Sequence, residues 1–198
     1  MSATSVVHRS ARPAQRIAAA AAAAGWLTDQ VFPGRPRSRD MHKLASRLDP
    51  VLSAEVTAPG VAGGAALEVM LTAALGRALA RTVGTGTLSV HVDGEQAEGS
   101  IGRLDCTLEP PLTTAALLSA YAPSVLADGA QSPEAWVSYR SVVAGTSAPE
   151  GYLLALHARR GADVIYLDWW YDSRSFERHT VEEFDDQLPL ALIEVTSN

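Results

Sequence analysis

The chain has 198 residues, of which 47% are hydrophobic and 19% charged, and its formal net charge is −6. This length can bury a hydrophobic core without disulfides or a structural metal, and the composition is that of a soluble globular protein. The acidic balance argues against a nucleic-acid partner held through its phosphates, and no apolar run approaches the roughly 18 residues of a membrane span. We therefore expect a cytoplasmic protein with no nucleic-acid or membrane partner.

The first 42 residues differ in composition from the rest. Basic residues precede a run of seven alanines at 18–24, which superficially copies a signal peptide. Alanine forms helices well but is weakly hydrophobic, so a short surface helix after a basic tail fits better. Residues 32–37 (FPGRPR) are rich in chain breakers and charge and are typical of a linker. We predict an arm and linker over 1–42 and one folded domain over 43–198.

The first half of that domain contains the clearest helix. Residues 43–57 suit a strand with a loop, and residues 66–84 carry apolar side chains at helical spacing. Gly84 supplies a C-terminal stop for the helix. Residues 87–94 alternate apolar and polar side chains, which predicts a half-buried strand.

The second half of the domain contains further strands. Residues 100–111 predict a second strand-like piece that ends at two prolines, and residues 114–126 predict a helix. Residues 134–143 are rich in β-branched and aromatic residues and predict a strand. Residues 152–159 and 163–171 predict a hairpin.

The last predicted strand and helix contain a tryptophan pair and a helix-start signal. Trp169 and Trp170 are adjacent in a strand, so they point to opposite faces and at least one belongs to the core. Thr180 and Glu183 form a predicted capping box, and Pro189 predicts that the helix bends or ends early. An apolar stripe follows at three- and four-residue spacing: Val181, Phe184, Leu188, Leu192 and Val195.

Few residues suggest chemistry. The histidines show no metal-ligand spacing, so we expect no metal, and one cysteine excludes an internal disulfide. His91 and His157 are the candidates for a catalytic base, and the alternative for each is a structural, hydrogen-bonded histidine. Cys106 is most simply a small buried hydrophobe, because no partner base for a catalytic thiol is in sight. Asp168 and Asp172 flank the tryptophans and are ordinarily explained as carboxylates paired with arginines.

Five segments in order carry a family resemblance: LEVMLTAALGRALARTVG, TLSVHVDGE, SIGRLDCTLEPPL, AWVSYRSV and LDWWYDSRSFERHTVEEFDDQLPLALIEV. Residues 43–197 thereby resemble the C-terminal half of a condensation domain from nonribosomal peptide synthetases. The resemblance implies an α+β fold, an α/β sandwich that is half of a chloramphenicol-acetyltransferase-like fold, with helices packed on a mixed sheet. In that family the strand and helix around the double tryptophan are structural.

The departures from the family are as informative as the matches. Complete condensation domains carry an HHxxxDG motif in their N-terminal half, and this chain has no His-His pair. Gly94 is followed by Glu95 where the family has Gly-Arg. The resemblance therefore implies a half-domain without its acid/base histidine, which would expose apolar surface unless a partner covers it.

The resemblance implies a partner subunit of a condensation-type acyltransferase, paired with a chain that carries the complementary half or with a megasynthase. The substrates would be thioesters on the phosphopantetheine of a carrier protein, and the chain would bind no cofactor of its own. From position in the resemblance, the residues facing the tunnel or the partner are Ser100, Arg103, Cys106, Trp136, Ser138 and Tyr139. Two alternatives stay open: a non-catalytic scaffold that binds carrier proteins, and a self-contained homodimeric enzyme that uses His91 or His157.

Overall fold

The computed structural model describes residues 25–95, 99–108, 133–141 and 147–197. Within this part of the chain, six strands form one mixed sheet in the order β1-β6-β5-β4-β2-β3. The strands are β1 (Met41–Arg47), β2 (Gly86–Asp93), β3 (Ser100–Cys106), β4 (Ala135–Arg140), β5 (Leu154–Arg160) and β6 (Ile165–Asp172). β4 runs parallel to both β2 and β5, and the other neighbours are antiparallel. The predicted α+β fold with a mixed sheet is confirmed.

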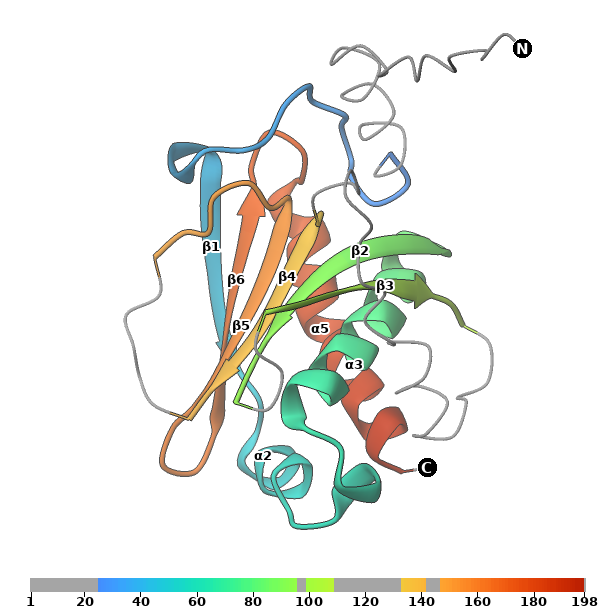
Figure 1. Cartoon of the computed structure of the whole chain (residues 1–198), viewed down its shortest axis with the longest axis vertical. Coiled ribbons are helices and arrows are strands. Elements are labelled where there is room, and N and C mark those ends of the chain that lie inside the picture. The colour runs from blue at the N-terminus through green and yellow to red at the C-terminus, as the bar shows by residue number, and fades with distance from the viewer. Residues whose placement is uncertain (1–24, 96–98, 109–132, 142–146, 198) are drawn as a thin grey trace, which may run out of the picture.

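Two long helices pack side by side against one face of this sheet (Figure 1). The α-helices of the described residues are α2 (Pro50–Val56), α3 (Leu67–Thr82) and α5 (Arg178–Thr196), and two short 3-10 turns are η1 (Ser38–Asp40) and η2 (Val61–Gly64). The predicted helix over 114–126 lies outside the described residues. Within the described residues, no helix is both long enough and apolar enough to cross a membrane.

The core lies between the sheet and these two helices. All five members of the predicted stripe on α5 are buried, and the apolar side of α3 is buried opposite them. Trp169 is fully buried beside Phe184, whereas Trp170 on the other sheet face is half-buried. The prediction that the two tryptophans point to opposite faces, with one in the core, is confirmed.

The start of α5 differs from its sequence-based prediction. The helix begins at Arg178 and its N-cap is Glu177, whose side chain makes no capping bond, so the predicted capping box at Thr180 is wrong. Thr180 already lies in the first turn. The carboxylate of Asp29 takes over the capping role, because it accepts hydrogen bonds from the Glu177 amide at 2.8 Å and the Thr180 hydroxyl at 3.1 Å.

Two further predictions need correction. Residues 50–56 form helix α2, with Asp49 accepting from the amides of Val51 and Leu52, where a loop was expected. Of the two outcomes predicted for Pro189, the early end is wrong, because α5 continues through it to Thr196, and the bend stays a prediction. Burial of the apolar side of α5 against α3 favours the helical path over the loss of one backbone hydrogen bond.

Residues 25–40, which the sequence assigns to the arm, contact the domain. Leu27 is fully buried in the core. Trp26 lies so close to Gly86 that a Cβ there would come within 2.3 Å of the indole, so glycine is the residue that fits this strand position. Core packing thus extends to the N-terminal side of Met41.

Candidate functional site

The two faces of the sheet carry different side chains. Alternate residues of β2, such as Val90 and Val92, point into the core beneath α3. Their neighbours share the opposite face, which we call the open face. Strand register places the following residues there: Lys43, His91, Asp93, Arg103, Trp136, Ser138, Arg140, Ala155, His157, Arg159, Asp168 and Trp170.

A polar row crosses the open face from β4 to β6. Ser138, His157 and Asp168 occupy directly opposite positions on three neighbouring strands. The Ser138 hydroxyl lies 2.5 Å from His157 Nδ1. All three residues are at least nine-tenths buried. The row therefore holds hydrogen-bonded polar groups within the sheet face rather than displaying them to solvent.

Basic side chains compensate the buried carboxylate at the end of this row. Lys43 Nζ lies 2.9 Å from Asp168 Oδ2, and Arg159 Nε lies 3.6 Å from the same oxygen. Asp172 is held by two hydrogen bonds of 2.8 Å from the Arg174 guanidinium. The pairing of both carboxylates with arginines, expected from the sequence, is confirmed, and Lys43 is an additional partner.

Burial determines the protonation of His157. Loss of solvent contact lowers its pKa to about 4, and the attraction of Asp168 for the charged form does not outweigh this loss. The imidazole is therefore neutral near neutral pH. A base of this pKa is poorly matched to proton abstraction there, because the best catalytic pKa lies near the operating pH.

The ring of His157 also contacts Trp136 edge-on, with ring centroids 4.5 Å apart and an interplanar angle of 83°. Its Nε2 is buried and has no hydrogen-bond partner among the residues that the structure describes. If the Ser138 hydroxyl donates to Nδ1, the proton of the neutral ring is on Nε2, where an N–H can interact with an aromatic face. This contact restrains Trp136 on the side that faces His157.

A second group of rings lies beside this row. His91 Nδ1 is hydrogen-bonded to the Tyr152 hydroxyl at 2.8 Å. The centroids of His91 and Trp136 are 5.9 Å apart, and those of Trp136 and Tyr152 are 5.5 Å apart. All three residues are half-buried. We call His91, Trp136 and Tyr152 the aromatic patch.

The eight candidate site residues proposed from the sequence lie on two different faces of the sheet. His91, Trp136, Ser138 and His157 form a continuous contact chain on the open face. Arg103 is exposed on the same face, on the edge strand β3.

The remaining three proposed residues belong to the core side of the sheet. Ser100 pairs with the core residue Val92, and Tyr139 is buried in the core cluster. Cys106 is also in that cluster, and burial raises the pKa of its thiol to about 12. A thiol with this pKa is protonated and inert near neutral pH.

Sequence reasoning missed Tyr152 and Lys43. Tyr152 lies two residues before β5 and contacts His91 of β2, a contact with no signature in its local sequence. Lys43 lies on β1, the edge strand at one end of the sheet, and meets Asp168 through the pairing of β1 with β6. Neither contact follows from spacing along the chain.

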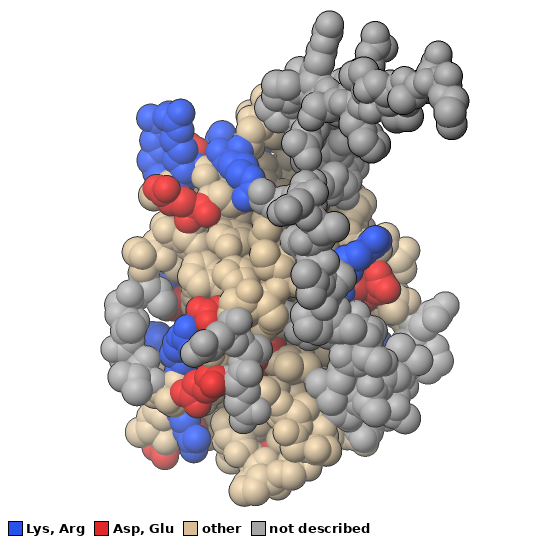
Figure 2. Space-filling view, viewed as in Figure 1, with Lys and Arg blue, Asp and Glu red and all other residues tan. Residues whose placement is uncertain are grey.

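Charges on the visible side of the molecule are mixed (Figure 2). Among the described residues, basic and acidic side chains lie next to one another on this side rather than in a field of one sign. On the open face, Arg140 and Asp93 form an ion pair of 2.7 Å. Within the described ranges, no group of three or more histidine, cysteine or acidic side chains could hold a metal ion.

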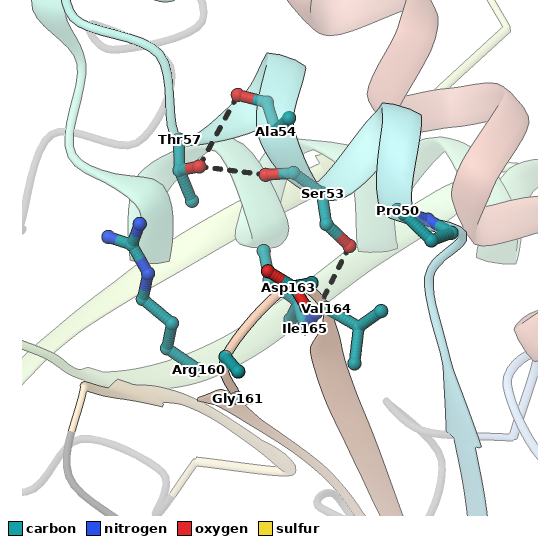
Figure 3. Close-up of a pocket in the computed structure, with 10 residues that line it drawn as sticks. Pro50, Ser53, Ala54, Thr57, Arg160, Gly161, Asp163, Val164 and Ile165 are labelled. Carbon is teal, nitrogen blue, oxygen red and sulfur yellow. Dashed lines mark hydrogen bonds between the residues drawn. The ribbon is translucent and has the colours of Figure 1, made fainter.

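A separate hollow of about 490 Å³ lies between α2 and the β5–β6 turn (Figure 3). Two of its polar side chains already serve the fold: the Ser53 hydroxyl accepts from the Ile165 amide at 3.0 Å, and the Thr57 hydroxyl donates to the Ser53 carbonyl at 2.8 Å. The hollow is lined by Pro50, Ser53, Ala54, Thr57 and residues 160–165. The aromatic patch and polar row therefore form the stronger candidate site.

Comparisons with known proteins identify relatives of this chain in sequence and in fold. No family model matches the chain. It is 24% identical, over 228 aligned residues, to a subunit of the phenolphthiocerol/phthiocerol polyketide synthase of Mycobacterium tuberculosis and of Mycobacterium bovis. The alignment covers 84% of this chain and 15% of each relative.

Solved structures give a closer view of the architecture. The epimerization domain of tyrocidine synthetase B, third module, matches with a TM-score of 0.64 at 15% identity, over 93% of this chain and 58% of that one. The X-domain of teicoplanin biosynthesis, in complex with OxyB, matches with a TM-score of 0.62 at 18% identity, over 86% of this chain and 48% of that one. The condensation domain of the Monacolin K polyketide synthase MokA matches with a TM-score of 0.58 at 16% identity, over 83% of this chain and 49% of that one.

These similarities define the class of fold. The chain has the architecture of condensation, epimerization and X domains, and it spans about half the length of these solved chains. The resemblance to one half of a condensation domain, read from the sequence, is thus confirmed at the level of the fold.

Proposed function

We propose that this chain is a partner subunit of a condensation-type acyltransferase in natural-product biosynthesis. One observation carries the proposal: the chain has a condensation-type fold, and its 198 residues contain no His-His pair. In this proposal a partner chain supplies the histidine-bearing half. The similarity to part of a polyketide synthase supports the same biosynthetic setting.

The reaction joins a carrier-bound acyl or aminoacyl thioester to an amine or alcohol. The nucleophile attacks the thioester carbon, its proton passes to a base, and the C–S bond breaks to release the carrier thiol. Such a reaction needs the nucleophile to be positioned against the thioester carbon, and it needs a proton acceptor. In this proposal the partner supplies the acceptor, and the open face of this chain supplies a wall of the site.

Two of the residues expected from the resemblance suit this role. Arg103 and Trp136 share the open face and are at least partly accessible, whereas Ser138 is buried on that face and Ser100, Cys106 and Tyr139 belong to the core side. In this proposal exposed Arg103 contacts a partner or a carrier protein. The half-buried rings on the same face contact the substrate chain.

Solution mass tests the proposal. The purified chain is measured by light scattering, alone and after mixing with a chain that carries the HHxxxDG half. A 1:1 complex that forms only on mixing, and that has an activity neither chain shows alone, supports the proposal. A homodimer that forms no complex with the partner after mixing contradicts the proposal.

A matched pair of charge reversals sharpens that test. Arg103→Glu changes the open face, and Arg178→Glu changes an exposed residue at the start of α5. We expect the first to weaken complex formation and the second to leave it unchanged. Equal effects of the two variants would place the interface elsewhere.

The burial of His157 favours a second candidate, a non-catalytic scaffold that binds carrier proteins. With its pKa at about 4 and its Nδ1 occupied by Ser138, this histidine is a poor base. Binding of a carrier protein without any activity in the mixed complex would support the scaffold. Loss of an activity in His91→Ala or His157→Ala variants of the unmixed chain would instead support a self-contained enzyme.

A further inference from the structure

The three rings of the aromatic patch are close to parallel. The interplanar angles are 14° for His91 and Trp136, 22° for His91 and Tyr152, and 32° for Trp136 and Tyr152. The corresponding centroid distances are 5.9, 6.0 and 5.5 Å. Each ring is therefore about equally far from the other two.

This geometry excludes a column of stacked rings. In a column, neighbouring planes lie about 3.5 Å apart and the outer rings are separated by about 7 Å, which is more than any pair here shows. The rings must instead be offset from one another, so that none covers the whole face of a neighbour. The hydrogen bond between His91 and the Tyr152 hydroxyl joins two of these rings through their edges.

Contacts with the polar row restrain the patch. Trp136 packs edge-on against buried His157, and His157 is in turn hydrogen-bonded to Ser138. The patch residues themselves remain half-buried, so part of each is accessible. A rigid aromatic surface loses little entropy when it binds a ligand.

We propose that the aromatic patch is a binding site for a planar aromatic ring, carried by an acyl or aminoacyl group. A flat ring can place its face against this surface in offset-stacked or tilted contact, whereas a saturated ring of similar size cannot. The nature of the larger molecule, an acyl or aminoacyl substrate, rests on the proposed function. The binding of the ring does not.

Two small probes test this site on the full chain. Naphthalene-2-carboxamide presents a flat ring system, and decahydronaphthalene-2-carboxamide is its saturated counterpart. Titrations followed through the indole N–H signals in NMR spectra give the affinity of each. We expect the aromatic probe to bind about tenfold more tightly than the saturated one. Equal affinities would overturn the proposal without any variant being needed.

Variants then locate the site. Trp136→Leu is expected to weaken binding of the aromatic probe about tenfold, whereas Tyr152→Phe, which keeps the ring, is expected to change it less than about threefold. Trp170→Leu is the matched control on the same sheet face and should leave the affinity unchanged. Thermal unfolding of each variant confirms that it is folded. A loss with Trp170→Leu but not with Trp136→Leu would overturn the proposal.

The result is separable from the proposed function. Trp136-dependent binding of the aromatic probe, in a chain that forms no complex with a partner half, would support the ring site and contradict the partner role. A catalytic complex whose chain binds both probes equally would support the partner role and overturn the ring site.

Discussion

The two faces of the sheet differ in how their side chains are held. On the helix side, Trp169 is fully buried between strands and α5, and its indole N–H donates to Asp185 at 2.7 Å. On the open face, Trp170 is half-buried and Lys43 lies 5.5 Å from its ring centroid. Adjacent residues of one strand thus differ in burial, because the helix side packs against α3 and α5 and the open face keeps some side chains partly accessible. Substitutions on the two faces can test this division.

The largest expected effect is on the helix side. Trp169→Ala should lower the free energy of unfolding by about 3–5 kcal/mol, because it leaves a cavity beside Phe184 and removes a donor from Asp185. Trp170→Ala should cost less than half as much. Urea denaturation followed by circular dichroism measures both. Equal losses would mean that the open face is as tightly packed as the core.

The next effect concerns pH and the polar row. Burial holds the pKa of His157 at about 4, against its ordinary 6.5, so between these values the unfolded chain binds a proton that the folded chain does not. Stability should therefore fall as pH drops from about 6.5 to 4, by at most about 3 kcal/mol from this group. Denaturation midpoints across that range measure the slope.

A paired comparison isolates this histidine. His157→Gln should flatten the slope between about pH 6.5 and 4 relative to the unsubstituted chain. An unchanged slope in the His157 variant would show that other groups cause the pH dependence.

A smaller effect is expected where the N-terminal segment meets α5. Asp29→Ala should cost about 1 kcal/mol, because it removes the acceptor for the Glu177 amide and the Thr180 hydroxyl. Asp29→Asn keeps one acceptor oxygen and should cost less. The free energy of unfolding in urea distinguishes them. No loss in either variant would mean that water caps the helix equally well.

The smallest effect on stability is expected at Arg103 on the open face. Arg103→Glu should change the free energy of unfolding by less than about 0.5 kcal/mol, because the side chain is exposed. Complex formation with the proposed partner should nevertheless weaken. A large loss of stability in thermal unfolding would instead give this residue a structural role.

Local patterns were sufficient for most of the fold. The spacing of Leu71, Leu75 and Leu79 on α3 predicted a buried side, because helical periodicity depends only on the nearby sequence. The alternation in β2 and the opposite faces of Trp169 and Trp170 followed from the two-residue period of a strand. The five segments in order were also sufficient to indicate the condensation-type architecture.

Contacts between distant segments required the tertiary structure. The capping of α5 by Asp29 joins residues 148 positions apart, so the local capping-box signal at Thr180 was misleading. The aromatic patch draws its rings from β2, β4 and the segment before β5. The polar row of Ser138, His157 and Asp168 depends on strand register. Periodicity indicates which face a side chain occupies, but only the pairing of strands places it beside a particular neighbour.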